Sequence, residues 1–221
     1  MRKLILLNLV AFFIFGIACG GSTKSDHSRM NHNSMNHNPM SHNSANVNAI
    51  DHTSHGPMTS DPGAADAPYD LQFIDSMIHH HEGAIEMSEL VLKKSSNEEI
   101  KKFAQKIIGD QRREIAQMKE WREKWYAGKP PAKNMEMAGM ADSMRTMTDG
   151  MMKNLEAANG KDFDLLFLEL MSGHHDGAVV MATEAKQKAE RPEIKTLAGQ
   201  IVEAQQAEIK KMSDWRAQWM K

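Results

Sequence analysis

Histidine and methionine stand together twice in this sequence, in two sets with the same internal spacing. In each set a histidine pair follows a methionine by three positions and precedes a second methionine by seven, counted from the first histidine. The two sets are Met77, His80, His81 and Met87, and Met171, His174, His175 and Met181. Imidazole and thioether donors without a thiolate favour copper over zinc or iron, because thioether sulfur is a soft ligand suited to Cu(I). The sets predict binding of Cu(I), Cu(II) or both, with no organic cofactor.

A competing interpretation treats the paired histidines as packed core residues that hydrogen-bond polar neighbours. The polar neighbours expected on the partner helices are Gln111, Glu114, Gln205 and Glu208. In a metal site these four side chains would orient the imidazoles by binding their other ring nitrogens. The recurrence of the whole set favours the metal site over simple packing. Neither pair has the Glu-x-x-His spacing of a di-iron bundle, and no catalytic residue is predicted.

A second group of candidate ligands repeats every five residues near the N-terminus. It comprises His27, Met30, His32, Met35, His37, Met40 and His42. The surrounding segment, 19–68, is rich in Asn, Ser, Gly and Pro and poor in large aliphatic residues, which predicts a disordered tail. Such a tail would capture metal by wrapping around it; the alternative is a hydrophilic spacer with incidental histidines.

An internal duplication predicts the elements that hold the histidine pairs. Residues 70–125 nearly recur at an offset of 94 positions, without insertions. Each copy has apolar residues every three or four positions in two stretches, which is typical of two helices joined by a short turn. The sequence therefore predicts an all-α, ferritin-like four-helix bundle over residues 69–221. Its parts are repeat 1 (69–126), one long crossover (127–160) and repeat 2 (161–221).

Two further groups of residues are expected inside or beside this bundle. Asp70 with Arg122, and Asp164 with Arg216, are predicted to form buried structural ion pairs, because the antiparallel hairpins bring each pair together. The crossover carries methionines three and four positions apart: Met137, Met140, Met144, Met147 and Met151. Methionines at helical spacing are more often packing residues than ligands, so packing is favoured over metal transfer.

The N-terminus predicts export. Residues 1–18 have a basic start and a short apolar run, as a signal peptide does. Cys19, the only cysteine, follows it directly and is expected to carry a lipid that anchors the protein to a bacterial membrane, facing the periplasm or the cell surface. The alternative is an ordinary signal peptide cut nearby. A formal net charge of −2 gives no electrostatic basis for nucleic-acid binding.

The paired motifs resemble the domain-of-unknown-function family 305. The resemblance rests on FIDSMIHHHEGAIEM (73–87) and LFLELMSGHHDGAVVM (166–181), and covers residues 69–219. The family commonly has proline before the histidine pair, where this chain has His79 and Gly173. The resemblance implies a ferritin-like helical bundle, export, and copper binding and tolerance.

Three hypotheses for function follow, in order of preference. The first is a copper-binding lipoprotein that sequesters copper or passes it to a transport or efflux partner. The second is a metalloenzyme on the same bundle, such as a cuprous oxidase. The third is a metal-free adhesion or scaffold module at the cell surface.

Overall fold

A computed structural model of the chain describes residues 59–221, and this part is helical. The predicted signal peptide, the lipidation site Cys19 and the His/Met-rich tail segment lie outside the described residues. The helices are η2 (Ala64–Asp66), α1 (Tyr69–Lys94), α2 (Glu98–Tyr126), α3 (Met140–Arg145), α4 (Asp149–Ala157), α5 (Gly160–Lys188) and α6 (Pro192–Trp219).

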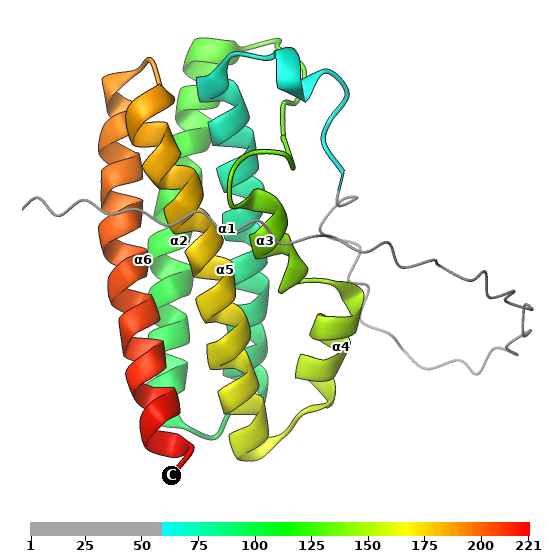
Figure 1. The fold of residues 1–221 in the computed structure, drawn as a ribbon, viewed down its shortest axis with the longest axis vertical. Helices are drawn as coiled ribbons and strands as arrows, with labels where there is room; N and C mark the ends of the chain where they lie inside the picture. The colour runs from blue at the N-terminus through cyan, green and yellow to red at the C-terminus, as the bar shows by residue number, and fades with distance from the viewer. Residues whose placement is uncertain (1–58) are drawn as a thin grey trace, which may run out of the picture. The chain divides into compact units, whose positions relative to one another are not determined.

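The four long helices form the bundle that the duplication predicts (Figure 1). Helices α1 and α2 make one antiparallel hairpin, α5 and α6 make the other, and the hairpins meet mainly where α1 packs on α5. The prediction of an all-α four-helix bundle built from two duplicated hairpins is confirmed. None of the described helices has a stretch long and apolar enough to cross a membrane.

Local signals in the sequence explain where the second helix of each hairpin begins. The Asn97 side chain accepts hydrogen bonds from the backbone N–H groups of Glu99 and Ile100, which caps α2. Helix α6 starts at Pro192, where a missing N–H costs nothing because the first helical N–H groups have no partner within the helix.

The predicted ion pairs Asp70–Arg122 and Asp164–Arg216 are wrong. The Asp70 carboxylate instead accepts hydrogen bonds from the backbone N–H groups of Glu190 and Arg191, at 2.9 and 3.0 Å, just before α6 begins. Asp164 is hydrogen-bonded to Ser95, in the corresponding turn before α2. Each aspartate therefore faces the opposite hairpin and binds its turn, rather than pairing with an arginine of its own hairpin. A carboxylate at this place also complements the positive end of the helix dipole.

The two arginines pair with acidic residues that stand five positions further along the first helix of each hairpin. Arg122 Nε donates to Asp75 Oδ1 at 2.8 Å, and Arg216 donates to Glu169 Oε2 at 2.7 Å. Asp75 and Glu169 are themselves equivalent in the two repeats. Each repeat thus has an arginine ion pair, but the acidic partners are Asp75 and Glu169 rather than the predicted Asp70 and Asp164.

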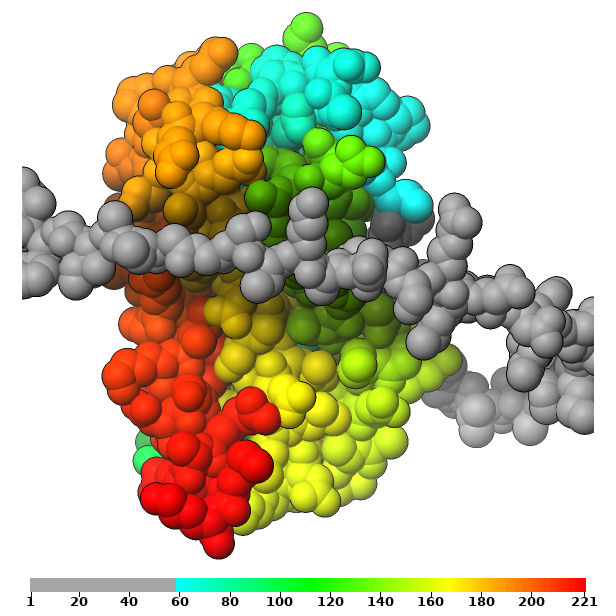
Figure 2. Space-filling model, in the orientation of Figure 1, coloured from blue at the N-terminus to red at the C-terminus, as the bar shows by residue number. Residues whose placement is uncertain are grey.

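The crossover between the hairpins contains two short helices and packs against the bundle. Helix α3 contacts α5 and, less extensively, α1. In Figure 2 the crossover, in green to yellow-green, occupies the face of the bundle beside α5. The approach is closest at Gly139 and Gly177: a Cβ on Gly177 would lie 2.5 Å from the Gly139 carbonyl oxygen. Glycine on both sides allows the two backbones to touch, which fixes α3 over the middle of α5.

Candidate metal centre

All four paired histidines lie in the interior of the bundle, where α1 and α5 face each other. His80, His81, His174 and His175 have no solvent exposure. The rings of His80 and His174, from opposite hairpins, lie with centroids 3.8 Å apart and planes tilted by 37°. Equivalent residues of the two repeats therefore meet at the interface between the hairpins.

The outer histidine of each pair binds a glutamate of its own hairpin. His81 Nε2 lies 2.6 Å from Glu114 Oε2, and His175 Nε2 lies 3.0 Å from Glu208 Oε2. A carboxylate only accepts hydrogen bonds, so each Nε2 carries the proton and donates. In a neutral ring this leaves the lone pair on Nδ1. The two glutamates thus face the histidines as the register of the hairpins predicts, and they fix the tautomer of both rings.

His80 reaches the same tautomer through a different partner. Its Nε2 lies 2.9 Å from the carbonyl oxygen of His174 and 2.6 Å from Ser143 Oγ, and the serine hydroxyl donates to the same carbonyl at 2.5 Å. The carbonyl oxygen accepts both hydrogen bonds, so His80 Nε2 also carries a proton. Burial, together with the neighbouring His81, holds the pKa of His80 well below its usual 6.5, despite the opposing hydrogen bond to the carbonyl. The ring is therefore neutral, with its lone pair on Nδ1.

In their neutral forms, three of these rings keep a lone pair inside the bundle. Nδ1 of His80, His81 and His175 is buried and has no hydrogen-bond partner among residues 59–221. Buried polar atoms without partners cost about 1–3 kcal/mol each, and such atoms call for an explanation. A metal ion accepts this lone pair, and metal-bound histidines characteristically donate their other ring N–H to a carboxylate or a backbone carbonyl. The donor set fits a metal.

The four predicted methionine ligands flank the histidines on both sides. Met77 and Met181 belong to one hydrophobic cluster, Met87 and Met171 to the other, and all four are fully buried. Each cluster therefore combines one methionine from each repeat. Within residues 59–221 no three His, Cys, Asp or Glu side chains lie close enough to hold one ion. The other donors buried in these clusters are the methionine sulfurs, which suit a soft ion such as Cu(I).

Gln111 and Gln205 occupy the interior without the role expected for them. Both side chains are buried, and their amide groups have no hydrogen-bond partner in the described part of the chain. The two glutamines therefore lie inside the bundle, but it is the glutamates that bind the histidines.

Two residues that bear on the site were not selected from the sequence. Ser143, in the crossover, holds His80. Lys106 Nζ lies 2.8 Å from Glu208 Oε1 and 2.7 Å from Asp110 Oδ2, so it connects α2 to the glutamate that binds His175. Burial by itself would raise the pKa of Glu208, but the hydrogen bonds from His175 and Lys106 and the charge of Lys106 hold the pKa below its usual value.

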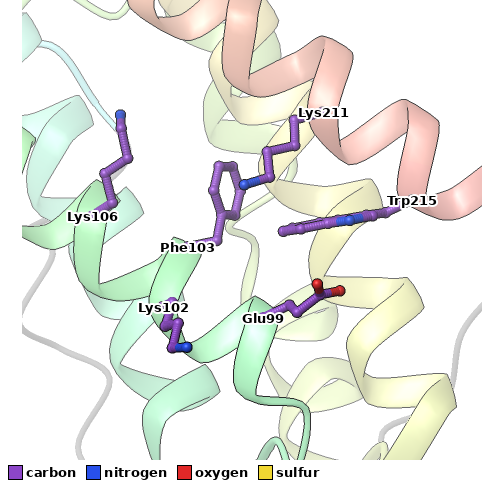
Figure 3. A pocket seen from close by; sticks show the side chains of 6 residues that line it. All are labelled: Glu99, Lys102, Phe103, Lys106, Lys211 and Trp215. Atoms are coloured by element: carbon purple, nitrogen blue, oxygen red, sulfur yellow. The ribbon is translucent and has the colours of Figure 1, made fainter.

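Lys106 also belongs to the wall of a surface groove between α2 and α6. The groove has a volume of about 270 Å³ and is lined by Glu99, Lys102, Phe103, Lys106, Lys211 and Trp215 (Figure 3). Lys211 extends over the Phe103 and Trp215 rings, with Nζ 5.2 and 4.5 Å from their centroids. No histidine or methionine lines this groove, so it is separate from the candidate metal centre.

The fold and site define a class: a helical bundle duplicated from one hairpin, with paired histidines and methionines in its interior. The family model described as "Domain of unknown function (DUF305)" matches residues 70–216. The chain belongs to the DUF305 family. Comparison with curated proteins gives no match.

Solved structures similar to this chain include metal-bound proteins. One is described as CopM in the Cu(I)-bound form, with 38% identity, a TM-score of 0.56, and coverage of 69% of this chain and 98% of that one. The Cu(II)-bound form of CopM has 39% identity, a TM-score of 0.56, and coverage of 68% and 97%. A putative secreted DUF305 protein from Streptomyces coelicolor has 33% identity, a TM-score of 0.60, and coverage of 68% and 93%.

Proposed function

We propose that this protein is an exported copper-binding protein whose bundle holds the metal with histidine and methionine. The observation that carries the proposal is the set of three buried Nδ1 atoms without partners, each on a ring whose Nε2 proton is held by a carboxylate or a carbonyl. Packing alone explains the buried rings but leaves these three nitrogen atoms without a partner.

Soft coordination follows from the neighbours of these rings. The methionines Met77, Met87, Met171 and Met181 supply thioethers on both sides of the histidines, and the interior excludes water. Cu(I) favours such a site, since it accepts few ligands and prefers sulfur. The similar proteins solved with Cu(I) and Cu(II) support copper as the metal.

The wider role is proposed from the sequence. An export signal and a lipid on Cys19 would hold the protein at a membrane, and the His/Met repeats of the tail would capture copper for the bundle. The protein would then sequester copper, or pass it to a transport or efflux partner, and so contribute to metal tolerance.

The test is competition for Cu(I) against a chromogenic chelator. It uses a chain, here called the tail-substituted chain, in which every histidine and methionine of residues 20–58 is replaced by Gln or Leu, so that only the bundle binds. We expect binding far tighter than millimolar, and a loss of at least about tenfold when His81 and His175 are both replaced by Gln. The matched control is His79→Gln, because His79 has glycine as its counterpart in repeat 2. Equal binding by all three chains, or none, would contradict the proposal.

A further inference from the structure

The crossover inserts two side chains into equivalent notches of the two hairpins. Gly83 and Gly177 correspond to each other in the repeats, and at each one the crossover fills the place that a side chain would take. A Cβ on Gly177 would lie 2.6 Å from Ser143 Oγ, and a Cβ on Gly83 would lie 2.5 Å from Met147 Sδ. Ser143 and Met147 are four positions apart, so they project from consecutive turns of the crossover.

Each inserted side chain lies beside a paired histidine of the opposite hairpin. Ser143, in the notch of α5, hydrogen-bonds His80 of α1. Met147 lies in the notch of α1, where the same Cβ on Gly83 would also lie 3.2 Å from Nε2 of His174 on α5. The thioether sulfur and this ring nitrogen therefore face the same small volume. The two insertions differ in chemistry: a hydroxyl hydrogen-bonds His80, whereas a thioether borders the same space as His174.

We propose that Met147 and His174 Nε2 form a soft-metal site at Gly83, through which Cu(I) enters the bundle. This inference rests on the proposed function, and it adds a ligand from outside both repeats. His174 is fully buried whereas Met147 is partly exposed, so an ion from solvent can reach the methionine side chain first. Met151, four positions later and 42% exposed, provides a further thioether at the surface.

The absence of a side chain at Gly83 is part of the site. A Cβ on Gly83 would overlap the Met147 sulfur, so the Met147 side chain would have to move. It can do so because its end is flexible. Helix interiors disfavour glycine by about 1 kcal/mol relative to alanine. A glycine that admits a ligand accounts for a position that otherwise weakens α1.

The test follows the methionine methyl groups by ¹³C NMR in the tail-substituted chain while Ag(I), a redox-inert probe for Cu(I), is added. We expect the Met147 methyl resonance, assigned from its loss in Met147→Leu, to shift with the first equivalents. Met147→Leu should weaken Ag(I) binding by at least about tenfold. The matched control is Met152→Leu, which replaces a buried methionine of the crossover that packs in the same cluster.

Two results would overturn the assignment in distinguishable ways. If the tail-substituted chain binds Ag(I) tightly while the Met147 methyl resonance stays in place and Met147→Leu binds equally well, Met147 is a packing residue and only this inference fails. If the tail-substituted chain binds no Ag(I) or Cu(I) at all, the proposed function fails with it.

Discussion

The two hairpins carry the same histidine pair in different surroundings. In the first hairpin, His81 binds Glu114, whose side chain is 19% exposed. In the second, His175 binds Glu208, which is 9% exposed and also bound by Lys106 from the first hairpin. The position equivalent to Lys106 is Gln200, and the position equivalent to Asp110 is Ala204. The charge chain Asp110–Lys106–Glu208–His175 thus has no copy in the first repeat.

This difference shows what duplication preserves and what it leaves free. The contacts within a hairpin, from histidine to glutamate and from arginine to acid, recur in both copies. Between the hairpins, Asp70 and Asp164 also make equivalent contacts with the opposite turns. The contacts of Lys106 and of the single crossover have no second copy. The two halves are therefore expected to bind metal by the same donors but with different strength.

The largest expected effect is a difference in stability between alanine variants of the two notch glycines, Gly83 and Gly177. Gly177→Ala should destabilise the bundle by about 2–3 kcal/mol, because the new Cβ would overlap the Gly139 backbone, which cannot move aside cheaply. Gly83→Ala should be close to neutral, since a gain of about 1 kcal/mol in helix propensity offsets displacement of a flexible thioether. Urea unfolding of the metal-free protein measures both. Equal losses would show that the crossover does not fit the two notches as described.

A second comparison removes the carboxylate behind each outer histidine. Glu114→Gln and Glu208→Gln should each lower Cu(I) affinity about tenfold, since a neutral amide supports the ring less strongly than a carboxylate. Only Glu208→Gln should also lower the stability of the metal-free protein, because it removes the partner of Lys106. Chelator competition and thermal unfolding give the two readouts. Loss of stability in Glu114→Gln but not in Glu208→Gln would contradict the stabilising role assigned to the Lys106–Glu208 ion pair.

A third change acts on the charge chain alone. Lys106→Gln installs the residue found at the equivalent position of repeat 2 and should lower stability by about 0.2–1 kcal/mol, because the lysine side chain is 56% exposed and its ion pairs are screened. Gln200→Lys is the matched control. It places a lysine at the equivalent position of repeat 2, where Ala204 stands in place of the acidic neighbour Asp110. Comparable shifts in the urea midpoint for both variants would show that the charge chain through Lys106 makes no specific contribution to stability.

A further prediction concerns the pH dependence of stability. His80 is buried and neutral with a lowered pKa, whereas an unfolded histidine takes up a proton near pH 6.5. Below that pH the unfolded state binds more protons, so stability of the metal-free bundle should fall by up to about 1.4 kcal/mol per pH unit. In His80→Gln this slope between pH 7.5 and 5.5 should be shallower, as unfolding experiments at several pH values would reveal. An unchanged slope would mean that His80 takes up its proton in the folded state.

The architecture and the histidine–glutamate contacts follow from the sequence, because periodicity and duplication determine which residues share a face. The ion-pair partners of Arg122 and Arg216 did not follow, since a projection places residues on a face but does not say which neighbouring helix that face meets. Asp70 faces the other hairpin, while Asp75 faces α2.

The contributions of the crossover were harder to predict for a different reason. Ser143 and Met147 lie in a segment that occurs once, so no second copy distinguishes a functional side chain from a packing one. The glycines Gly83 and Gly177 were the available signal, because glycine recurs at equivalent positions in the middle of two helices. Lys106 gave no such signal, since its partner lies on the other hairpin.

The most direct test is long-range ¹H–¹⁵N NMR of the histidine rings in the tail-substituted chain as Ag(I) is added. We expect Nε2 of His81 and His175 to be protonated before addition and to remain so, while the Nδ1 resonances of both rings shift on binding. Protonated Nδ1 in the metal-free protein, or metal-induced shifts confined to Nε2, would contradict the account.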